Sequence, residues 1–325
     1  MALPRDVYVV GAARTAIGTF GGALKDVPLA DLATLAVKTA LERSGADAAS
    51  VGHLAMGTVI PTEPRDAYLS RVAAMNAGCP KETPAFNVNR LCGSGLQAIV
   101  SAAQAITLGD CEIAIGAGAE SMSRGAYLLP QARWGARMGD SPMLDFVVGA
   151  LHDPFHKIHM GITAENVGEQ YGISRSMMEE LAVESHRRAA AAIAEGRFKS
   201  QIVPVVIPSK KGDISFDTDE HVKPGTTMET LATMRAAFKK DGAVTAGNAS
   251  GINDGAGAVV LASAEAVKAG KLKPIARLVS YAHAGVEPTL MGIGPVPATR
   301  LALARAGLKV GDLDGIQSHE AFAAQ

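Results

Sequence analysis

Cys92 lies in residues 89–95, which read NRLCGSG, between an extended apolar run and a helical stretch over residues 96–108. A cysteine at a strand-to-helix turn faces the free amide groups of the helix start, whose positive potential favours thiolate over thiol. Gly93 and Gly95 allow substrate and backbone to approach closely. The pattern predicts a cysteine nucleophile, with a small buried hydrophobic residue as the alternative role for Cys92.

The other two cysteines, Cys79 and Cys111, are predicted to be structural. The three cysteines form an odd set, and none of them stands in a CxxC pair. This argues against both a disulfide framework and a zinc knuckle. We therefore expect a reducing compartment and a cytoplasmic protein.

The composition excludes several classes of function. Lys and Arg number 31 against 32 Asp and Glu, so the chain has no cationic surplus that would recruit nucleic acid or an anionic membrane surface. Apolar stretches are interrupted well short of the ~18 residues that a membrane-spanning helix needs, and the N-terminus lacks the apolar core of a secretory peptide. We expect no nucleic-acid partner, no membrane partner and no leader.

Apolar runs alternate with helical patterns along the chain, which predicts an α/β protein. Strands are expected at residues 7–10, 54–60, 85–88, 112–118, 256–262 and 274–282. A helix with Leu32, Ala36 and Ala40 on one face should end at Gly45. Strands that alternate with helices predict a mostly parallel sheet with right-handed crossovers.

Residues 121–247 are richer in Met, Gly, Arg and Pro and are predicted to form an inserted loop domain. Two helices are expected inside it, over residues 163–171 and 176–195. The spacing of Ser176 and Glu179 indicates a capping box at the start of the second helix.

The sequence also contains an internal repeat. The helix ending at Gly45 and the apolar run after it recur 262 residues later, as a helix ending at Gly307 and a run with Leu313 and Ile316. The same offset places the counterpart of Cys92 beyond the end of the sequence. The repeat predicts a duplicated architecture with a truncated second copy, unless two generic helix-to-strand units match by chance.

Six motifs resemble those of the thiolase family, in particular the biosynthetic and broad-range 3-ketoacyl-CoA thiolases. They are RTAIGTFGG at 14–22, NRLCGSGLQA at 89–98, GAESMS at 118–123, HMGITAENV at 159–167, TAGNASGINDGA at 245–256 and HEAFAAQ at 319–325. The resemblance covers nearly the whole chain and implies an acyltransferase with an acyl thioester on Cys92. Its reaction would be thiolytic cleavage of 3-ketoacyl-CoA, or the reverse condensation of two acyl-CoA molecules, such as acetyl-CoA to acetoacetyl-CoA.

The resemblance also implies the thiolase fold, in which two duplicated βαβαβ halves stack in a layered α/β/α/β/α arrangement. The N-terminal half would then cover residues 1–120 and 248–272, the coenzyme A-binding loop domain residues 121–247, and an incomplete C-terminal half residues 273–325. The same resemblance implies a homotetramer built as a dimer of dimers.

Coenzyme A and acyl-CoA would be substrates, with no permanently bound cofactor and no metal. By resemblance, the residues along the pantetheine arm and the acyl chain would be Leu151, His159, Met160, Phe238, Ala246, Ala249, Ser250, Ala321 and Phe322. Lys223 stands where related enzymes commonly have an arginine near the nucleotide phosphates. A lysine there supplies charge but no bidentate fork.

His319 is a departure from the family pattern. Most biosynthetic thiolases have asparagine in a NEAF motif, where the side chain holds a water that donates to an oxyanion, and this sequence reads HEAF. An imidazole can also anchor such a water, so we expect a catalytic His319, with a tolerated polar replacement as the alternative.

Two thiolase motifs are missing from the 325 residues. These are the GHPxG histidine and the CxGGG cysteine, which supply the base and the acid/base of the reaction. We therefore expect a C-terminally incomplete thiolase sequence. The alternatives are a non-catalytic, truncated thiolase-like subunit for acyl-CoA binding or assembly, and a related ketoacyl or hydroxymethylglutaryl-CoA synthase, which GNASGINDGA fits poorly.

The histidines outside these motifs are weaker candidates. His152, His156 and His159 cluster in HDPFHKIHMG, but Pro154 disrupts a helical register and no HExxH pattern occurs, so no metal site is expected. The remaining histidines are interpreted as structural or surface residues: His53, His186, His221 and His283.

Overall fold

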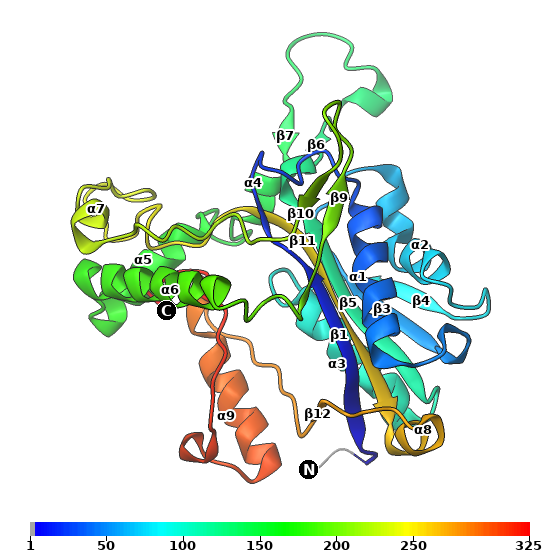
Figure 1. The fold of residues 1–325 in the computed structure, drawn as a ribbon. Helices are drawn as coiled ribbons and strands as arrows, with labels where there is room; N and C mark the ends of the chain where they lie inside the picture. Colours follow the sequence, from blue (N-terminus) through cyan, green and yellow to red (C-terminus); the bar gives the residue numbers. More distant parts are fainter. Residues whose placement is uncertain (1–3) are drawn as a thin grey trace.

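A large sheet with helices on both faces forms the body of the molecule, and a loop-rich lobe and a thin arm project from it (Figure 1). The computed structural model describes residues 4–325. The strands of the large sheet are β1 (Val7–Thr15), β2 (Gly18–Thr19), β3 (His53–Gly57), β4 (Ala85–Val88), β5 (Ile113–Ser121), β8 (Ile202–Val203), β11 (Asn253–Ser263) and β12 (Ala276–Arg277). Their order is β12, β1, β11, β5, β3, β4, with β2 beside β11 and β8 beside β1.

The helices divide between the two faces of this sheet and the projecting lobe. They are α1 (Leu29–Ser44), α2 (Leu69–Asn76), α3 (Ser94–Leu108), α4 (Phe146–Ala150), α5 (Met160–Tyr171), α6 (Arg175–Ala194), α7 (Met228–Ala232), α8 (Ala264–Gly270) and α9 (Pro295–Ala306). α1 and α2 pack on one face in the main apolar core. α3 packs on the other face in a second core with Ala103, Ile106 and Leu261. The body thus has three layers, helix, sheet and helix.

The prediction of a mostly parallel sheet is wrong. The βαβ units β3–α2–β4 and β4–α3–β5 place β3, β4 and β5 parallel to one another. β11, however, lies antiparallel to both β1 and β5 and separates them. Because β11 follows β5 by more than a hundred residues, its direction depends on the route of the intervening chain and not on a local crossover.

The predicted first helix is confirmed as α1. Its buried side chains include Leu32, Ala36 and Ala40, the expected apolar face. The helix ends at Gly45, which adopts a φ of 70° in the left-handed region. Glycine reaches this conformation without steric cost, which explains the sharp stop.

Glycines let α3 lie unusually close to the sheet. A Cβ on Gly116 of β5 would lie 2.4 Å from the Cα of Ile99, and a Cβ on Gly57 of β3 would lie 2.4 Å from the carbonyl carbon of Ser94. Both neighbours are backbone atoms of α3 and cannot rotate away. The position of the helix that follows Cys92 therefore depends on bare backbone in two adjacent strands.

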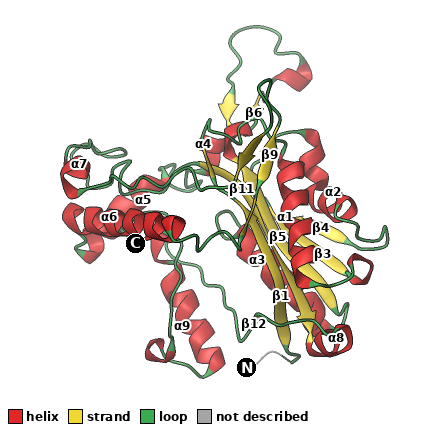
Figure 2. Cartoon of the chain, in the orientation of Figure 1, coloured by secondary structure: helices red, strands yellow, loops and turns green. Residues whose placement is uncertain are grey.

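Residues 121–247 contain much irregular chain, two small hairpin sheets and helices α4 to α7 (Figure 2). The small sheets are β6 (Tyr127–Leu128) with β7 (Leu144–Asp145), and β9 (Val205–Ile207) with β10 (Ile214–Phe216). The two expected helices are present as α5 and α6. The capping prediction for α6 is wrong by two residues, because the Ser174 hydroxyl, and not Ser176, accepts the backbone N–H of Met177.

The internal repeat has a partial structural counterpart. α9 ends at Gly307 with a φ of 70°, as α1 does at Gly45. The short 3₁₀ helices Ala48–Ser50 and Val310–Asp312 follow at equivalent positions. The apolar run with Leu313 and Ile316 does not form a strand, so the repeat of the first half stops there in the described residues.

By length and composition alone, residues Leu91–Leu108 pass as a membrane-spanning helix, with a mean hydropathy of 1.3. This stretch contains α3, which packs against β3 and β5. Its apolar character is thus accounted for by packing on the sheet.

We predict that Gly116→Ala lowers the free energy of unfolding by about 1–3 kcal/mol, because the added methyl group overpacks the α3–β5 contact. Gly149→Ala in α4 is the control, since its new Cβ would meet no atom within 4 Å. Its effect should stay below about 1 kcal/mol. Urea denaturation of both variants measures the difference, and equal stabilities would contradict the close approach of α3 to the sheet.

Candidate active site

Cys92 sits in a tight turn between β4 and α3. Leu91, just before it, has a φ of 46°, a left-handed conformation that a branched side chain rarely adopts. The turn is held by backbone bonds from Gly93 N–H to the Arg90 carbonyl (3.1 Å) and from Ser94 N–H to the Leu91 carbonyl (2.9 Å). The Ser94 hydroxyl closes it by donating to the Leu91 carbonyl at 2.6 Å and accepting the Arg90 N–H at 2.8 Å.

This turn presents the thiol at the mouth of a helix. Cys92 is exposed, and the N-cap of α3 is Gly93, which has no side chain to cap the first amides. Amide donors of an uncapped helix start can stabilise negative charge on a sulfur or on an oxyanion. The combination of strain, exposure and a free helix terminus fits a reactive nucleophile, as the motif predicts.

The other cysteines differ in their surroundings. Cys79 is buried, and burial raises the pKa of its thiol. Burial together with the neighbouring Asp110 and Glu112 raises the pKa of Cys111 to about 11. Neither thiol is suited to nucleophilic chemistry at neutral pH, in line with the structural roles predicted for both.

A second group of predicted site residues gathers around α5. His159 is the N-cap residue of this helix, and its ring stacks on Phe238 with centroids 4.7 Å apart. Phe238 in turn meets Phe322 edge to face at 6.1 Å. The backbone N–H of Met160 donates to the Leu151 carbonyl at 2.8 Å. Five of the residues predicted for the pantetheine arm and acyl chain thus lie in one connected cluster.

The loop with Ala249 and Ser250 joins the same cluster. Ser250 N–H donates to the Ala321 carbonyl at 2.8 Å, and Ala323 N–H donates to the Asn248 carbonyl at 2.9 Å. The TAGNASG and HEAF motifs, which are about seventy residues apart in sequence, therefore lie side by side as two backbone-paired segments.

The proton on His159 has a defined position. Its Nδ1 accepts the Gly161 N–H at 3.0 Å, so in the neutral ring the proton is on Nε2. Burial, and then the charge of His152, lowers the pKa of His159. A neutral imidazole is thus favoured, and among residues 4–325 no hydrogen bond uses its Nε2–H, which can donate to a ligand.

Three predicted residues lie outside this cluster. Lys223 is exposed and held through its backbone N–H, which donates to His186 Nδ1 at 3.2 Å. His319 is exposed near the end of the chain, and Ala246 lies on the loop before Ala249. Among residues 4–325, Cys92 shares no hydrogen bond with any member of the cluster.

The histidine-rich segment has its own internal contacts. His152 meets the His159 ring edge to face at 5.1 Å, and His156 Nδ1 pairs with Asp153 at 2.9 Å. In the part of the chain that the structure describes, no three His, Cys, Asp or Glu side chains come together as a metal site.

Two carboxylates that hold backbone segments in place were missed by the sequence analysis. Glu120, at the end of β5, accepts the backbone N–H groups of Val59 and Ile60, each at 2.9 Å. Glu165 of α5 accepts those of Ala243 and Val244 at the same distance. Their positions inside GAESMS and HMGITAENV were visible, and an acidic residue in an otherwise apolar segment was the signal that could have found them.

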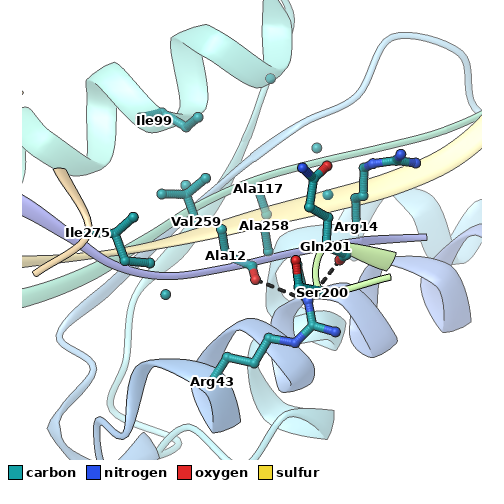
Figure 3. A pocket seen from close by; sticks show the side chains of 16 residues that line it. Ala12, Arg14, Arg43, Ile99, Ala117, Ser200, Gln201, Ala258, Val259 and Ile275 are labelled. Atoms are coloured by element: carbon teal, nitrogen blue, oxygen red, sulfur yellow. Dashed lines mark hydrogen bonds between the residues drawn. The ribbon is translucent and has the colours of Figure 1, made fainter. Parts of the chain in front are cut away.

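A cavity of about 750 Å³ opens on the α3 side of the sheet (Figure 3). Ile99, Val259 and Ile275 line its apolar part, and Arg43 crosses its rim by donating to the Ala12 and Gln201 carbonyls. Cys92 is not among the lining residues, but Gly95, in the first turn of α3, is one of them.

We predict that iodoacetamide at neutral pH modifies Cys92 while Cys79 and Cys111 stay largely unmodified. Exposure favours the first thiol, and burial disfavours the thiolate of the other two. Peptide mass spectrometry of the folded protein measures the three sites separately. Preferential labelling of Cys79 or Cys111 would show that Cys92 is not the reactive thiol.

Glu120 should make stability depend on pH. Burial raises its pKa from 4.5 to about 7, against the opposing effect of its two backbone donors. Between these pH values the folded protein holds a proton on Glu120 that the unfolded chain has lost, so the contribution of Glu120 to stability is highest below pH 4.5 and falls as the pH rises to about 7.

We therefore predict that Glu120→Gln reduces the change in the free energy of unfolding between pH 4.5 and about 7 by on the order of 2 kcal/mol. The free energy of unfolding of both proteins, measured by urea denaturation at several pH values, gives the two slopes. Identical slopes for wild type and variant would rule out a titrating Glu120.

Comparison with known proteins identifies the family of this chain. The family descriptions "Thiolase, N-terminal domain" and "Thiolase, C-terminal domain" match residues 7–265 and 272–325. The chain is 62% identical over 325 residues to the beta-ketothiolase BktB of Cupriavidus necator, covering 99% of this chain and 82% of that protein. It is 48% identical to an acetyl-CoA acetyltransferase of Syntrophomonas wolfei, again covering 99% of this chain and 82% of the relative.

A solved structure agrees as well. The crystal structure of human mitochondrial 3-ketoacyl-CoA thiolase in complex with CoA superposes with a TM-score of 0.95 at 42% identity, covering 100% of this chain and 81% of that one. Both the sequence and the fold match along essentially the whole chain. The chain therefore belongs to the thiolase family of acyl-transferring enzymes.

Proposed function

We propose that this thiolase-family acyltransferase moves acyl groups to and from coenzyme A through a thioester on Cys92. The overall reaction is thiolytic cleavage of 3-ketoacyl-CoA or its reverse, the condensation of two acyl-CoA molecules. The observation that carries this proposal is the exposed Cys92 in a strained turn at the uncapped start of α3.

In the cleavage direction, the Cys92 sulfur attacks the 3-keto carbon of the substrate. The bond between the α- and β-carbons then breaks, its electron pair forms the enolate of acetyl-CoA, and that enolate takes up a proton. Coenzyme A attacks the acyl thioester, a new acyl-CoA leaves, and the Cys92 thiol is restored. In this second step one thioester is exchanged for another, so the step is nearly balanced in energy and reversible.

Coenzyme A binding is proposed for the cluster around α5. The human relative was solved in complex with CoA. Here the His159 ring stacks on Phe238, and Phe322 meets Phe238 edge to face, so the three rings form a wall. In the described residues no hydrogen bond uses His159 Nε2–H, which is available as a donor beside this wall. We assign the pantetheine arm to this wall with Leu151, Met160, Ala246, Ala249, Ser250 and Ala321, and the nucleotide phosphates to Lys223.

His319 is assigned to the oxyanion. It is exposed two residues before Ala321, whose carbonyl accepts the Ser250 N–H, so the backbone pairing of the two motifs sets its position. An imidazole there can hold a water that donates to developing negative charge. No residue within the 325 is assigned to the transfer of the α-proton.

The domain and assembly assignments extend the proposal. Residues 121–247 are the coenzyme A loop domain, set between an N-terminal half (1–120 and 248–272) and the C-terminal half (273–325).

The arm around β6 and β7 exposes Trp134 at 82% and Met138 at 96%, which supports burial against further copies in a homotetramer. The three free cysteines support a reducing, cytoplasmic location.

We predict that Cys92→Ser lowers the exchange of isotope-labelled coenzyme A into acetyl-CoA by about a thousandfold or more, because the thioester intermediate is lost. Cys111→Ser is the matched control, which removes a thiol remote from the proposed chemistry and should leave exchange unchanged. Exchange is followed by chromatography of the two labelled pools.

Two results would contradict the proposal. Undiminished exchange in the Cys92→Ser protein would remove Cys92 from the reaction. Absence of exchange in the wild type, with coenzyme A still bound, would favour a non-catalytic acyl-CoA-binding or assembly subunit.

A further inference from the structure

We propose that Glu165 is a positioning residue for the proposed pantetheine site, and that it acts by fixing residues 243–250 against α5. This site, lined by His159, Phe238, Phe322, Ala249 and Ser250, is called the channel below. The proposal rests on the proposed function of the α5 cluster. Glu165 itself touches no proposed substrate position and acts through the segment that it holds.

The carboxylate of Glu165 holds two consecutive amides. Its Oε1 accepts the Val244 N–H and its Oε2 accepts the Ala243 N–H, both at 2.9 Å. The residue is only 6% exposed. Hydrogen bonds to a carboxylate are roughly twice as strong as bonds between neutral groups, and two of them fix the orientation of the segment as well as its distance.

The segment upstream of these amides carries one wall of the channel. Ala237 N–H donates to the Val244 carbonyl at 2.9 Å, which forms a hairpin that presents Phe238. Phe238 stacks on His159, at the start of the same helix that carries Glu165. A displaced segment at residue 244 would therefore separate the two rings.

The segment downstream carries Ala249 and Ser250, which pair with the HEAF motif. Asn248 continues the anchoring, because its side chain accepts the Thr245 N–H at 2.8 Å and donates to the Ala243 carbonyl at 3.0 Å. Ala323 N–H then donates to the Asn248 carbonyl at 2.9 Å. These bonds connect Ala243 to Ala323 through Asn248. A shift of Ala243 would therefore also move the segment that follows His319.

In the described residues, each of the two amides has the Glu165 carboxylate as its hydrogen-bond acceptor. Ala164, Met178, Val244 and Ala324 form an apolar cluster here, and Glu169, Arg175, Lys239 and Asp241 line a hollow together with Glu165 and Ala243. Removal of the acceptor leaves two amides without a partner, one of them buried. Leaving a buried N–H without an acceptor destabilises the folded state by more free energy than a satisfied hydrogen bond contributes. Residues 243–250 would therefore shift to give these amides another partner.

Gly242 provides an independent way to displace the carboxylate. A Cβ at this position would lie 2.2 Å from Glu165 Oε1 and 3.0 Å from the Lys239 carbonyl oxygen. Gly242→Ala therefore pushes Glu165 off its amides while its charge and length are kept. In a Glu165→Ala background the clash with the carboxylate is gone, and the 3.0 Å contact with the Lys239 carbonyl oxygen is what remains.

The test measures acylation of Cys92 by acetyl-CoA as a function of acetyl-CoA concentration. Glu165→Gln and Gly242→Ala should each raise the half-saturating concentration by about tenfold and change the saturating rate by less than about twofold. Adding Gly242→Ala to Glu165→Ala should cause no further increase. Glu169→Gln, one turn along α5, is the matched control and should behave as wild type, because it loses only an ion pair with Lys239 whose side chains are 75% and 52% exposed.

The rate of Cys92 alkylation by iodoacetamide is measured on every variant, because it reports the reactive turn and needs no channel. It should stay constant, which separates a shifted channel from a misfolded protein. If Glu165→Gln fails to fold, Gly242→Ala carries the test alone.

Unchanged half-saturation in the folded variants, or additive losses in the double variant, would overturn the role of Glu165. A wild-type protein that is alkylated at Cys92 but never acylated would instead refute the proposed function, and the inference with it.

Discussion

The close contact between α3 and the sheet is the constraint on which the reactive turn depends. Bare backbone at Gly57 and Gly116 lets the helix rest directly on β3 and β5. The packing of α3 on β3 and β5 therefore fixes the start of the helix, and with it the position of Cys92. A turn with a left-handed Leu91 is costly by itself, and it persists because the elements on both sides are held so firmly.

The nucleophile and the proposed coenzyme A site are held in place by different kinds of structure. The nucleophile belongs to the rigid sheet layer, between β4 and α3. The proposed coenzyme A wall is assembled from irregular segments, joined by ring stacking and backbone hydrogen bonds. Buried carboxylates occur where such segments meet a rigid element. Glu120 holds the loop after β3, and Glu165 holds the loop before TAGNASG.

Local features of the fold were predictable from the sequence. Gly45 ends α1 and Gly307 ends α9, because only a residue without a Cβ adopts the left-handed stop easily. The apolar run at residues 85–88 is β4, and the Cys92 turn follows it as the spacing indicates. These features depend on a few neighbouring residues, which the sequence displays directly.

Features that depend on distant partners were not predictable. The antiparallel insertion of β11 between β1 and β5 requires pairing across more than a hundred residues. The hydrogen bonds of Glu165 to Ala243 and Val244 could not be predicted either, because these residues are nearly eighty positions away in the sequence. The cap of α6 was misplaced for a smaller reason, since Ser174 and Ser176 are both good caps and the chain path selects the first.

Peptide-level mass spectrometry after incubation with acetyl-CoA tests the central claim most directly. The account predicts one acetyl group on the peptide that contains Cys92, bound as a thioester that hydroxylamine removes. Acetylation of Cys79 or Cys111 in its place, or a hydroxylamine-resistant acetyl group, would contradict it.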